Sequence, residues 1–257
     1  MQMSNVILTP YRLFFVDQTD ILFALMKDGR VSRVKKIDSF ANASADFQNV
    51  TGVRFDGENT HVTTVSLDFD SCPAELATFF GYAYYPTLNK DASFLALIRA
   101  DLLSPRPFGV MIIYKKWRKK WKPVLERKSF MKRPVWSKFT DSLFFINIFQ
   151  QLVKINPTGE EEIIAHNVVD FALSALQTQV VCWDGTFLRI LSVLDKTESD
   201  RFPASSLNAF ACSNDEKSLY LSVSLEGKNN IYCMDIASKK TLLLTQTPGV
   251  VPFIFTP

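Results

Sequence analysis

The chain has 257 residues, of which 47% are hydrophobic and 21% are charged, and its formal net charge at pH 7 is +3. This composition excludes an intrinsically disordered chain and allows one large domain or two ordinary ones. Residues 1–135 are net basic and residues 136–257 are net acidic, which favours two modules with any anionic partner on the first. No apolar run reaches the roughly 18 residues that span a bilayer, and the N-terminus does not resemble a signal peptide, so we expect a soluble cytoplasmic protein.

The predicted secondary structure is all β. Short apolar runs rich in Val, Ile, Phe and Tyr alternate with turn residues along the whole chain. The clearest runs are residues 13–16, 21–26, 62–67, 79–85, 94–98, 110–114 and 143–148. No segment shows a sustained helical period. Short strands with regular turns indicate a β-sandwich or a β-propeller.

The first half contains a specific order of features. An acidic turn at residues 56–59 is followed by Cys72-Pro73-Ala74, then by Phe108-Gly109, Tyr114-Lys115 and Trp121-Lys122. This order resembles the TerD family of tellurium-resistance and stress-response proteins, which are β-sandwiches. The resemblance implies a TerD-like β-sandwich over residues 1–130.

The same resemblance implies a calcium site in two acidic turns. TerD proteins bind calcium through aspartates clustered in two loops. The matching positions here are Asp17 and Asp20 in one turn, and Asp56, Glu58 and Asn59 in the other. Both turns carry fewer acids than the family pattern. Because calcium takes about six to eight oxygen ligands, this set predicts calcium (Ca2+) binding at reduced affinity, and the alternative is an ordinary Asp-Gly turn between strands.

The densest charge cluster follows in residues 115–122. It consists of Lys115, Lys116, Trp117, Arg118, Lys119, Lys120, Trp121 and Lys122. In a continuous strand, Lys116, Arg118, Lys120 and Lys122 would share a face, whereas a turn at residues 118–120 would gather the charges at a tip. The cluster can bind a protein partner, a nucleic acid or an anionic membrane. The alternative is a solvated edge hairpin with Trp121 in the core.

A repeat begins after a charged, linker-like segment at residues 126–135. Short segments that end in Ser137, Ser174, Ser213 and Thr256 recur at about 40 residues, each of the first three followed by a turn and apolar strands, a spacing typical of propeller blades. Residues 229–245 also resemble blades of TolB-like and WD-repeat propellers. These features predict β-propeller-like repeats over residues 131–257. Three such units are too few to close a ring, which needs about four to eight blades. Either the propeller is incomplete, or the last strand completes an earlier blade, or the repeats pack as an open sheet.

The alternative is one six-bladed β-propeller over the whole chain. Leu13-Phe14-Phe15-Val16 resembles Leu143-Phe144-Phe145-Ile146, and the two segments lie about three blades apart. The sequence therefore predicts either a sandwich joined to propeller repeats or a single ring.

The motifs of common enzymes are absent from the sequence. It contains no GxSxG, P-loop or GxGxxG motif, so we expect no enzymatic activity. The main functional prediction is a non-enzymatic binding or scaffold protein of a bacterial stress-response or tellurite-resistance system, with calcium bound. The alternative prediction is a whole-chain propeller that mediates protein–protein interaction.

Overall fold

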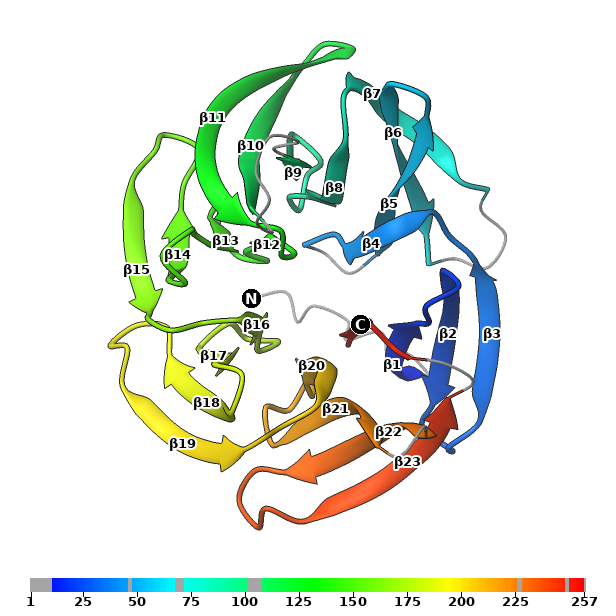
Figure 1. Cartoon of the computed structure of the whole chain (residues 1–257), viewed down its shortest axis with the longest axis vertical. Helices are drawn as coiled ribbons and strands as arrows, with labels where there is room; N and C mark the ends of the chain where they lie inside the picture. The colour runs from blue at the N-terminus through cyan, green and yellow to red at the C-terminus, as the bar shows by residue number, and fades with distance from the viewer. Residues whose placement is uncertain are drawn as a thin grey trace, which may run out of the picture.

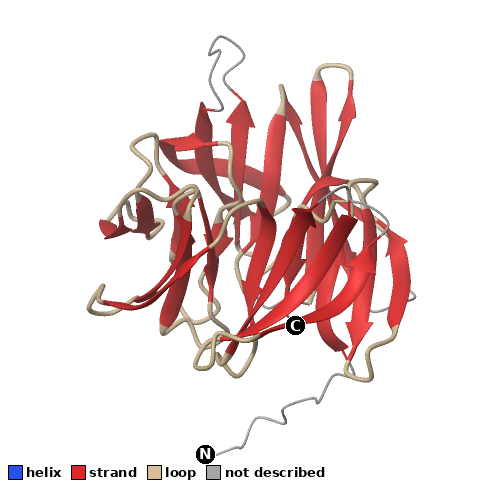
Figure 2. Ribbon diagram, turned by 60° about the horizontal axis from the view of Figure 1, so that its bottom comes forward, coloured by secondary structure: helices blue, strands red, loops and turns tan. Residues whose placement is uncertain are grey.

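The computed structural model describes residues 11–45, 48–67, 72–100, 108–225, 228–247 and 250–256. Their regular structure is entirely β, with 24 strands (Figure 2). The strands form six antiparallel sheets of four strands each, arranged as blades around a central axis (Figure 1). The chain is therefore all-β and is a single six-bladed β-propeller.

Blade 1 uses both ends of the chain, and blades 2 and 3 follow it in chain order. Blade 1 contains β24 (Phe253–Phe255), β1 (Tyr11–Val16), β2 (Ile21–Met26) and β3 (Val31–Lys36). Blade 2 contains β4 (Ser39–Ala43), β5 (Asn49–Asp56), β6 (Asn59–Ser66) and β7 (Ala74–Phe80). Blade 3 contains β8 (Ala83–Leu88), β9 (Phe94–Ala100), β10 (Phe108–Trp117) and β11 (Lys120–Phe130).

The remaining blades follow in chain order. Blade 4 contains β12 (Val135–Trp136), β13 (Leu143–Ile146), β14 (Leu152–Ile155) and β15 (Glu161–Ala165). Blade 5 contains β16 (Asp170–Leu173), β17 (Gln179–Trp183), β18 (Phe187–Ser192) and β19 (Glu198–Pro203). Blade 6 contains β20 (Leu207–Cys212), β21 (Ser218–Leu225), β22 (Lys228–Asp235) and β23 (Thr241–Thr247).

The ring is closed by strands from opposite ends of the chain. The innermost strand of blade 1 is β24, which pairs antiparallel with β1 so that Phe255 lies opposite Phe14 and Phe253 lies opposite Val16. The last strand thus completes the sheet that the first strands begin. This pairing covers the edge of β1 that faces the channel, and it leaves β24 as the innermost strand of the blade.

The resemblance to the TerD family is wrong, and so is the β-sandwich that it implied over residues 1–130. A sandwich packs two sheets face to face, whereas the three sheets of residues 11–130 pack side by side around the ring. Val53 and Val62 of blade 2, for example, pack against Leu97 and Ile112 of blade 3. Local strand and turn patterns are common to sandwiches and propellers, so they did not distinguish the two.

Blades are held together by apolar side chains on both faces of each sheet. In β13, Leu143 and Phe145 pack against blade 3, while Phe144 and Ile146 pack against blade 5. Both sets are buried, so this strand is a continuous apolar run and not an alternating one. Full burial of a Leu, Ile or Phe side chain contributes about 1.5–3 kcal/mol. The core is therefore a series of inter-blade clusters around the axis.

The predicted repeat corresponds to one turn of each blade. Ser137, Ser174 and Ser213 directly follow the innermost strands β12, β16 and β20. The amide of each donates a hydrogen bond to the carbonyl five residues later, at 2.7, 3.0 and 2.9 Å. The same bond occurs in blade 2 at Ser44 (2.9 Å) and in blade 3 at Asn89 (3.1 Å). The repeat thus extends into the first half of the chain.

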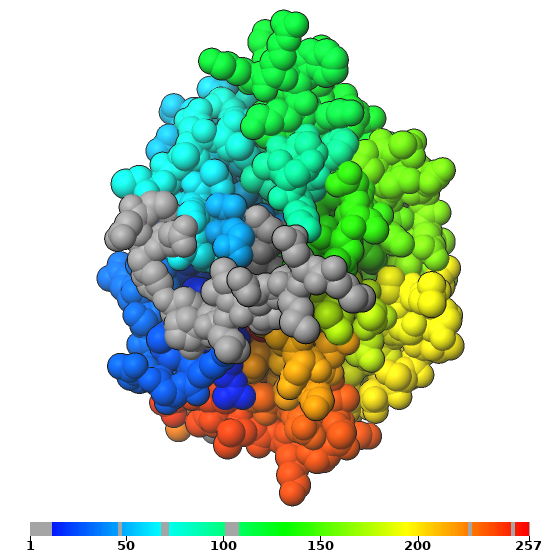
Figure 3. Space-filling model, turned by 180° about the vertical axis from the view of Figure 1, so that it is seen from behind, coloured from blue at the N-terminus to red at the C-terminus, as the bar shows by residue number. Residues whose placement is uncertain are grey.

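The two faces of the ring carry different loops. Because neighbouring strands are antiparallel, the connections between blades and the turns between second and third strands emerge on one face, called here the connection face. The other turns emerge on the opposite face, which is the view of Figure 3. None of the described segments is a helix long and apolar enough to cross a membrane.

Candidate functional site at the channel mouth

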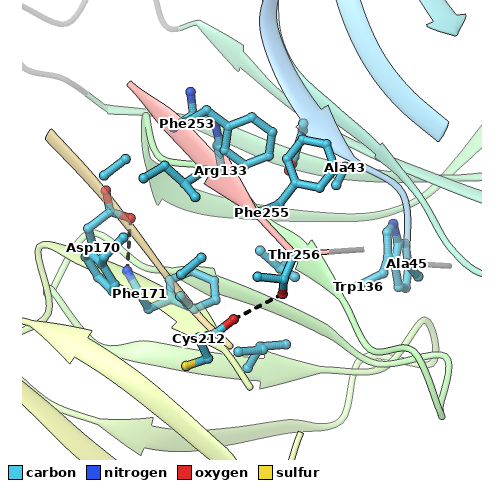
Figure 4. Close-up of a pocket in the computed structure, with 18 of the residues that line it drawn as sticks. Ala43, Ala45, Arg133, Trp136, Asp170, Phe171, Cys212, Phe253, Phe255 and Thr256 are labelled. Atoms are coloured by element: carbon cyan, nitrogen blue, oxygen red, sulfur yellow. Dashed lines mark hydrogen bonds between the residues drawn. The ribbon is translucent and has the colours of Figure 1, made fainter. Parts of the chain in front are cut away.

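The innermost strands surround a narrow central channel. A cavity of about 90 Å³ in this channel is lined by residues of blades 1, 2, 4, 5 and 6 (Figure 4). Small or apolar side chains such as Ala43, Ala45 and Phe255 form much of its wall. Arg133 and Asp170 are the charged residues that line it. Their charges distinguish the end of the channel at the connection face.

Arg133 is fixed by three other blades. It lies in the connection between β11 and β12, and its Nε and Nη1 donate to the carbonyls of Ala41 and Pro252, both at 3.0 Å. Its guanidinium lies 5.0 Å from the ring centroid of Tyr85 and 4.5 Å from that of Phe253. Burial lowers the pKa of Arg133, and nearby Tyr85 and Asp170 oppose that shift. One cation therefore links blades 1, 2, 3 and 4 at the mouth of the channel.

Two aromatic residues at the mouth have an unusual backbone conformation. Phe40 in β4 has φ 54° and Tyr85 in β8 has φ 52°, which is the left-handed region. Each lies at a register shift in the innermost strand of its blade. Such a conformation costs about 1–3 kcal/mol for a bulky side chain and is concentrated at functional sites. The bulges turn both rings toward one another, with centroids 5.5 Å apart.

The rings belong to a larger aromatic cluster between blades 2 and 3. Phe40 contacts Tyr84 edge to face at 4.7 Å, and Phe55 contacts both Tyr84 (5.6 Å) and Tyr82 (5.4 Å). Phe40 and Tyr82 are 36% and 38% exposed. Burial, together with the neighbouring tyrosines, raises the pKa of Tyr84. We call Phe40, Tyr84, Tyr85, Arg133 and Phe253 the mouth cluster.

The first acidic turn borders the mouth cluster. A second cavity, of about 290 Å³, is lined by Asp17 and Asp20 on one side and by Phe40, Tyr85 and Arg133 on the other. Oδ1 of Asp17 accepts bonds from the amide and hydroxyl of Thr19, at 2.9 and 2.8 Å, and from the amide of Ile21 at 3.0 Å. Oδ2 of Asp20 accepts the Ser39 hydroxyl at 2.6 Å. Both carboxylates thus stabilise the turn and its contact with blade 2.

The second acidic turn is a hairpin turn of another blade. Asp56 and Asn59 pair across the β5–β6 hairpin, and Asp56, Glu58 and Asn59 are exposed. Within the described ranges, no group of three or more His, Cys, Asp or Glu side chains could hold a metal ion. Calcium binding by the two turns stays a prediction for which the structure supplies no clustered ligand set.

The basic cluster forms a long hairpin in blade 3. Trp117 pairs with Lys120, so the turn consists of Arg118 and Lys119. Lys120 and Lys122 therefore share a face with Trp117 and not with Lys116, which pairs with Trp121 on the other face. Of the two arrangements predicted for this segment, the structure has the turn, at Arg118 and Lys119, and not the shared face of a continuous strand. The hairpin turn emerges on the face opposite the mouth cluster, and the hairpin projects from the rim of the ring (Figure 3).

The mouth cluster could not be recognised from the sequence. Arg133 lies in the segment predicted as a charged linker, and Tyr84 and Tyr85 lie in the run predicted at residues 79–85. No feature of the sequence singles out Phe40 or Phe253. Nothing in the local sequence signals the bulges at Phe40 and Tyr85, and ring closure alone brings Phe253 beside Arg133. The one available signal was an Arg-Pro pair directly before a repeat unit.

Comparisons with known proteins identify shared architecture. A scan against protein-family models found no match, and a search of curated proteins found none either. TolB from Acinetobacter baumannii has a similar structure, with TM-score 0.72 and 12% identity over 95% of this chain and 65% of the TolB chain. This chain thus spans slightly less than two thirds of the TolB chain.

Two further solved structures have similar folds. A chain of the nidogen/laminin complex matches with TM-score 0.69 and 14% identity over 95% of this chain and 97% of that one. A putative 6-phosphogluconolactonase from Bacteroides uniformis matches with TM-score 0.59 and 12% identity over 93% and 82%. At these identities the likeness establishes the β-propeller fold alone.

Proposed function

We propose that this β-propeller is a non-enzymatic protein-interaction module, and that its mouth cluster binds a segment of a partner protein. The observation that carries the proposal is the pair of aromatic residues Phe40 and Tyr85, whose strained backbone forms bulges beside Arg133. Aromatic residues and arginine are enriched at protein interfaces and dominate their binding energy. The mouth cluster thus has the composition of an interface hot spot.

The rigidity of the site supports the same proposal. Phe40 and Tyr85 lie on innermost strands, and Arg133 is hydrogen-bonded to the backbone of two blades. A preorganised site loses little conformational entropy when a ligand binds. The cavity beside it combines the Asp20 carboxylate, a guanidinium and aromatic rings, which together suit the mixed polar and apolar surface of a peptide. One of the similar propellers is also part of a protein–protein complex, that of nidogen and laminin.

A peptide selection tests this proposal. Peptides from a random library are selected on the full chain, and their affinities for variants are measured by titration calorimetry. Phe40→Asn removes the ring but tolerates the left-handed backbone. The matched control is Phe149→Asn, because Phe149 is 73% exposed in a turn of blade 4 on the same face. We expect Phe40→Asn to weaken binding at least about tenfold, or 1.4 kcal/mol, and the control to leave it unchanged.

The opposite pattern would refute the proposal. If the selected peptides bind Phe40→Asn as tightly as the unsubstituted chain, or if Phe149→Asn weakens them equally, the mouth cluster is not the binding site. Thermal unfolding of both variants verifies that the ring stays folded.

A further inference from the structure

The hairpin formed by β10 and β11 is an unusually long extension of its blade. The two strands have 10 and 11 residues, whereas the corresponding strands of blade 4 have 4 and 5 and those of blade 5 have 6 each. Residues 115–120 and 122–124 are exposed. We call residues 115–124 the overhang. It adds little to the inter-blade core and presents most of its side chains to solvent.

The cations of this hairpin are not neutralised within the described part of the chain. No carboxylate there forms an ion pair with any of the six basic residues, which are Lys115, Lys116, Arg118, Lys119, Lys120 and Lys122. Three of them instead contact aromatic rings. Lys115 lies 5.7 Å from the ring centroid of Phe94, and Lys122 lies 5.6 Å from that of Trp117. Such a concentration of like charge is unfavourable unless it has an anionic partner or solvent.

The two tryptophans have different roles. Trp121 faces blade 2, where its Nε1 donates to the carbonyl of Leu76 at 3.3 Å, so it anchors the hairpin. Trp117 is 57% exposed and lies on the other face, with Lys115, Lys120 and Lys122 around it. An exposed indole among cations combines a stacking surface with phosphate-binding groups.

We propose that this hairpin binds nucleic acid, with phosphates on its cations and a base stacked on Trp117. Cations occupy both faces and the tip of the hairpin, so a strand that follows its surface contacts more of them than a flat membrane does. Trp117 and Val124 are the only large apolar side chains exposed on the described overhang, which offers little area for insertion into lipid. The hairpin lies on a different face from the mouth cluster, so this activity is independent of the proposed protein interaction.

Fluorescence anisotropy on the full chain tests the proposal. The probes are a labelled single-stranded DNA of about 20 nucleotides, a labelled duplex of the same sequence, and labelled vesicles containing phosphatidylserine. We expect binding to the single strand that weakens with salt, by about 0.7 in log–log slope for each phosphate contacted. Binding to the duplex should be weaker, because paired bases cannot stack on Trp117.

Variants on the exposed face identify the site. The double substitution Lys120→Glu/Lys122→Glu should reduce single-strand affinity at least about tenfold at low salt and reduce the salt slope by about 1.4. Trp117→Ala should weaken binding about tenfold with an unchanged slope. The matched control is Lys239→Glu/Lys240→Glu, which reverses two exposed charges in the equivalent turn of blade 6 and should have a much smaller effect.

Three results would overturn the proposal. They are absence of single-strand binding at low salt, equal affinity of Lys120→Glu/Lys122→Glu and the unsubstituted chain, and binding of vesicles without binding of DNA. Tighter binding to the duplex would overturn the stacking role of Trp117. Phe40→Asn should leave DNA binding unchanged, so failure here does not affect the proposed function of the mouth cluster.

Discussion

Arg133 donates a hydrogen bond from its Nε to the carbonyl of Ala41, 92 residues earlier in the chain, at 3.0 Å. A second bond, from Nη1 to Pro252, reaches the strand that closes the ring. Arg133, a member of the proposed binding site, thus also links neighbouring blades. Binding and stability are therefore coupled at this position.

Substitution of Arg133 should destabilise the ring. In Arg133→Ala the carbonyls of Ala41 and Pro252 lose their donors, and unsatisfied buried groups cost about 1–3 kcal/mol each. We expect a loss of about 2–4 kcal/mol in the free energy of unfolding, measured by urea denaturation. Arg133→Lys should be intermediate, because an ammonium lacks the planar fork that reaches both carbonyls. Equal stability of Arg133→Ala and the unsubstituted chain would show that the bridge is unimportant.

At position 40 we expect the glycine variant to be more stable than the alanine variant, which reverses the usual order in a strand. In a strand, glycine is normally less stable than alanine by about 0.5–1 kcal/mol. At φ 54° the alanine Cβ is strained, so Phe40→Gly should be more stable than Phe40→Ala by about 1 kcal/mol. Phe55 in β5 lies in the same aromatic cluster without a positive φ, and there Phe55→Ala should be the more stable variant. Chemical denaturation of the four variants measures both orders; the same order at both positions would contradict the strained bulge.

Tyr114 should make the fold sensitive to alkaline pH. Burial raises the pKa of Tyr114, and Glu126 adds to this while Arg99 opposes it. A folded-state pKa above the unfolded value of about 10 means that the stabilisation is complete below pH 10 and is lost as pH rises through the folded pKa. We expect the thermal unfolding midpoint to fall above about pH 10, and to fall less steeply in Tyr114→Phe. Identical pH profiles would exclude Tyr114 as a contributor.

Phe255 should be essential for ring closure. Its ring stacks on Phe14 at 5.4 Å, and both side chains are almost fully buried. Phe255→Ala leaves a cavity in the closing sheet and should cost about 3–5 kcal/mol, measured by urea denaturation. Phe149→Ala, at a largely exposed ring, provides the control and should cost less than about 0.5 kcal/mol. A small loss in Phe255→Ala would mean that β24 does not hold the ring together.

Much of the secondary structure could be predicted from the sequence. The apolar run at residues 21–26 coincides with β2, and the run at 143–148 includes β13. The segments ending in Ser137, Ser174 and Ser213 mark the ends of β12, β16 and β20. Apolar runs and turn residues are local signals, so a single sequence suffices to find them.

The number of blades was harder to predict, because blades 2 and 3 obscure the period. Their counterparts of Ser137 are Ser44 and Asn89, which follow innermost strands that contain bulges. The long hairpin of blade 3 also increases the spacing before Ser137. Closure by β24 depends on residues at opposite ends of the chain, which local patterns do not connect. The mouth cluster depends on the bulges and on ring closure, so its residues could not be brought together from the sequence.

Hydrogen exchange of the full chain, with and without a selected peptide, tests the proposed protein interaction most directly. We expect slower exchange around Phe40, Tyr84 and Tyr85 and in the Arg133 connection, with little change in the turns of the opposite face. Protection confined to those turns or to residues 115–122, with none at Phe40 or Tyr85, would contradict it.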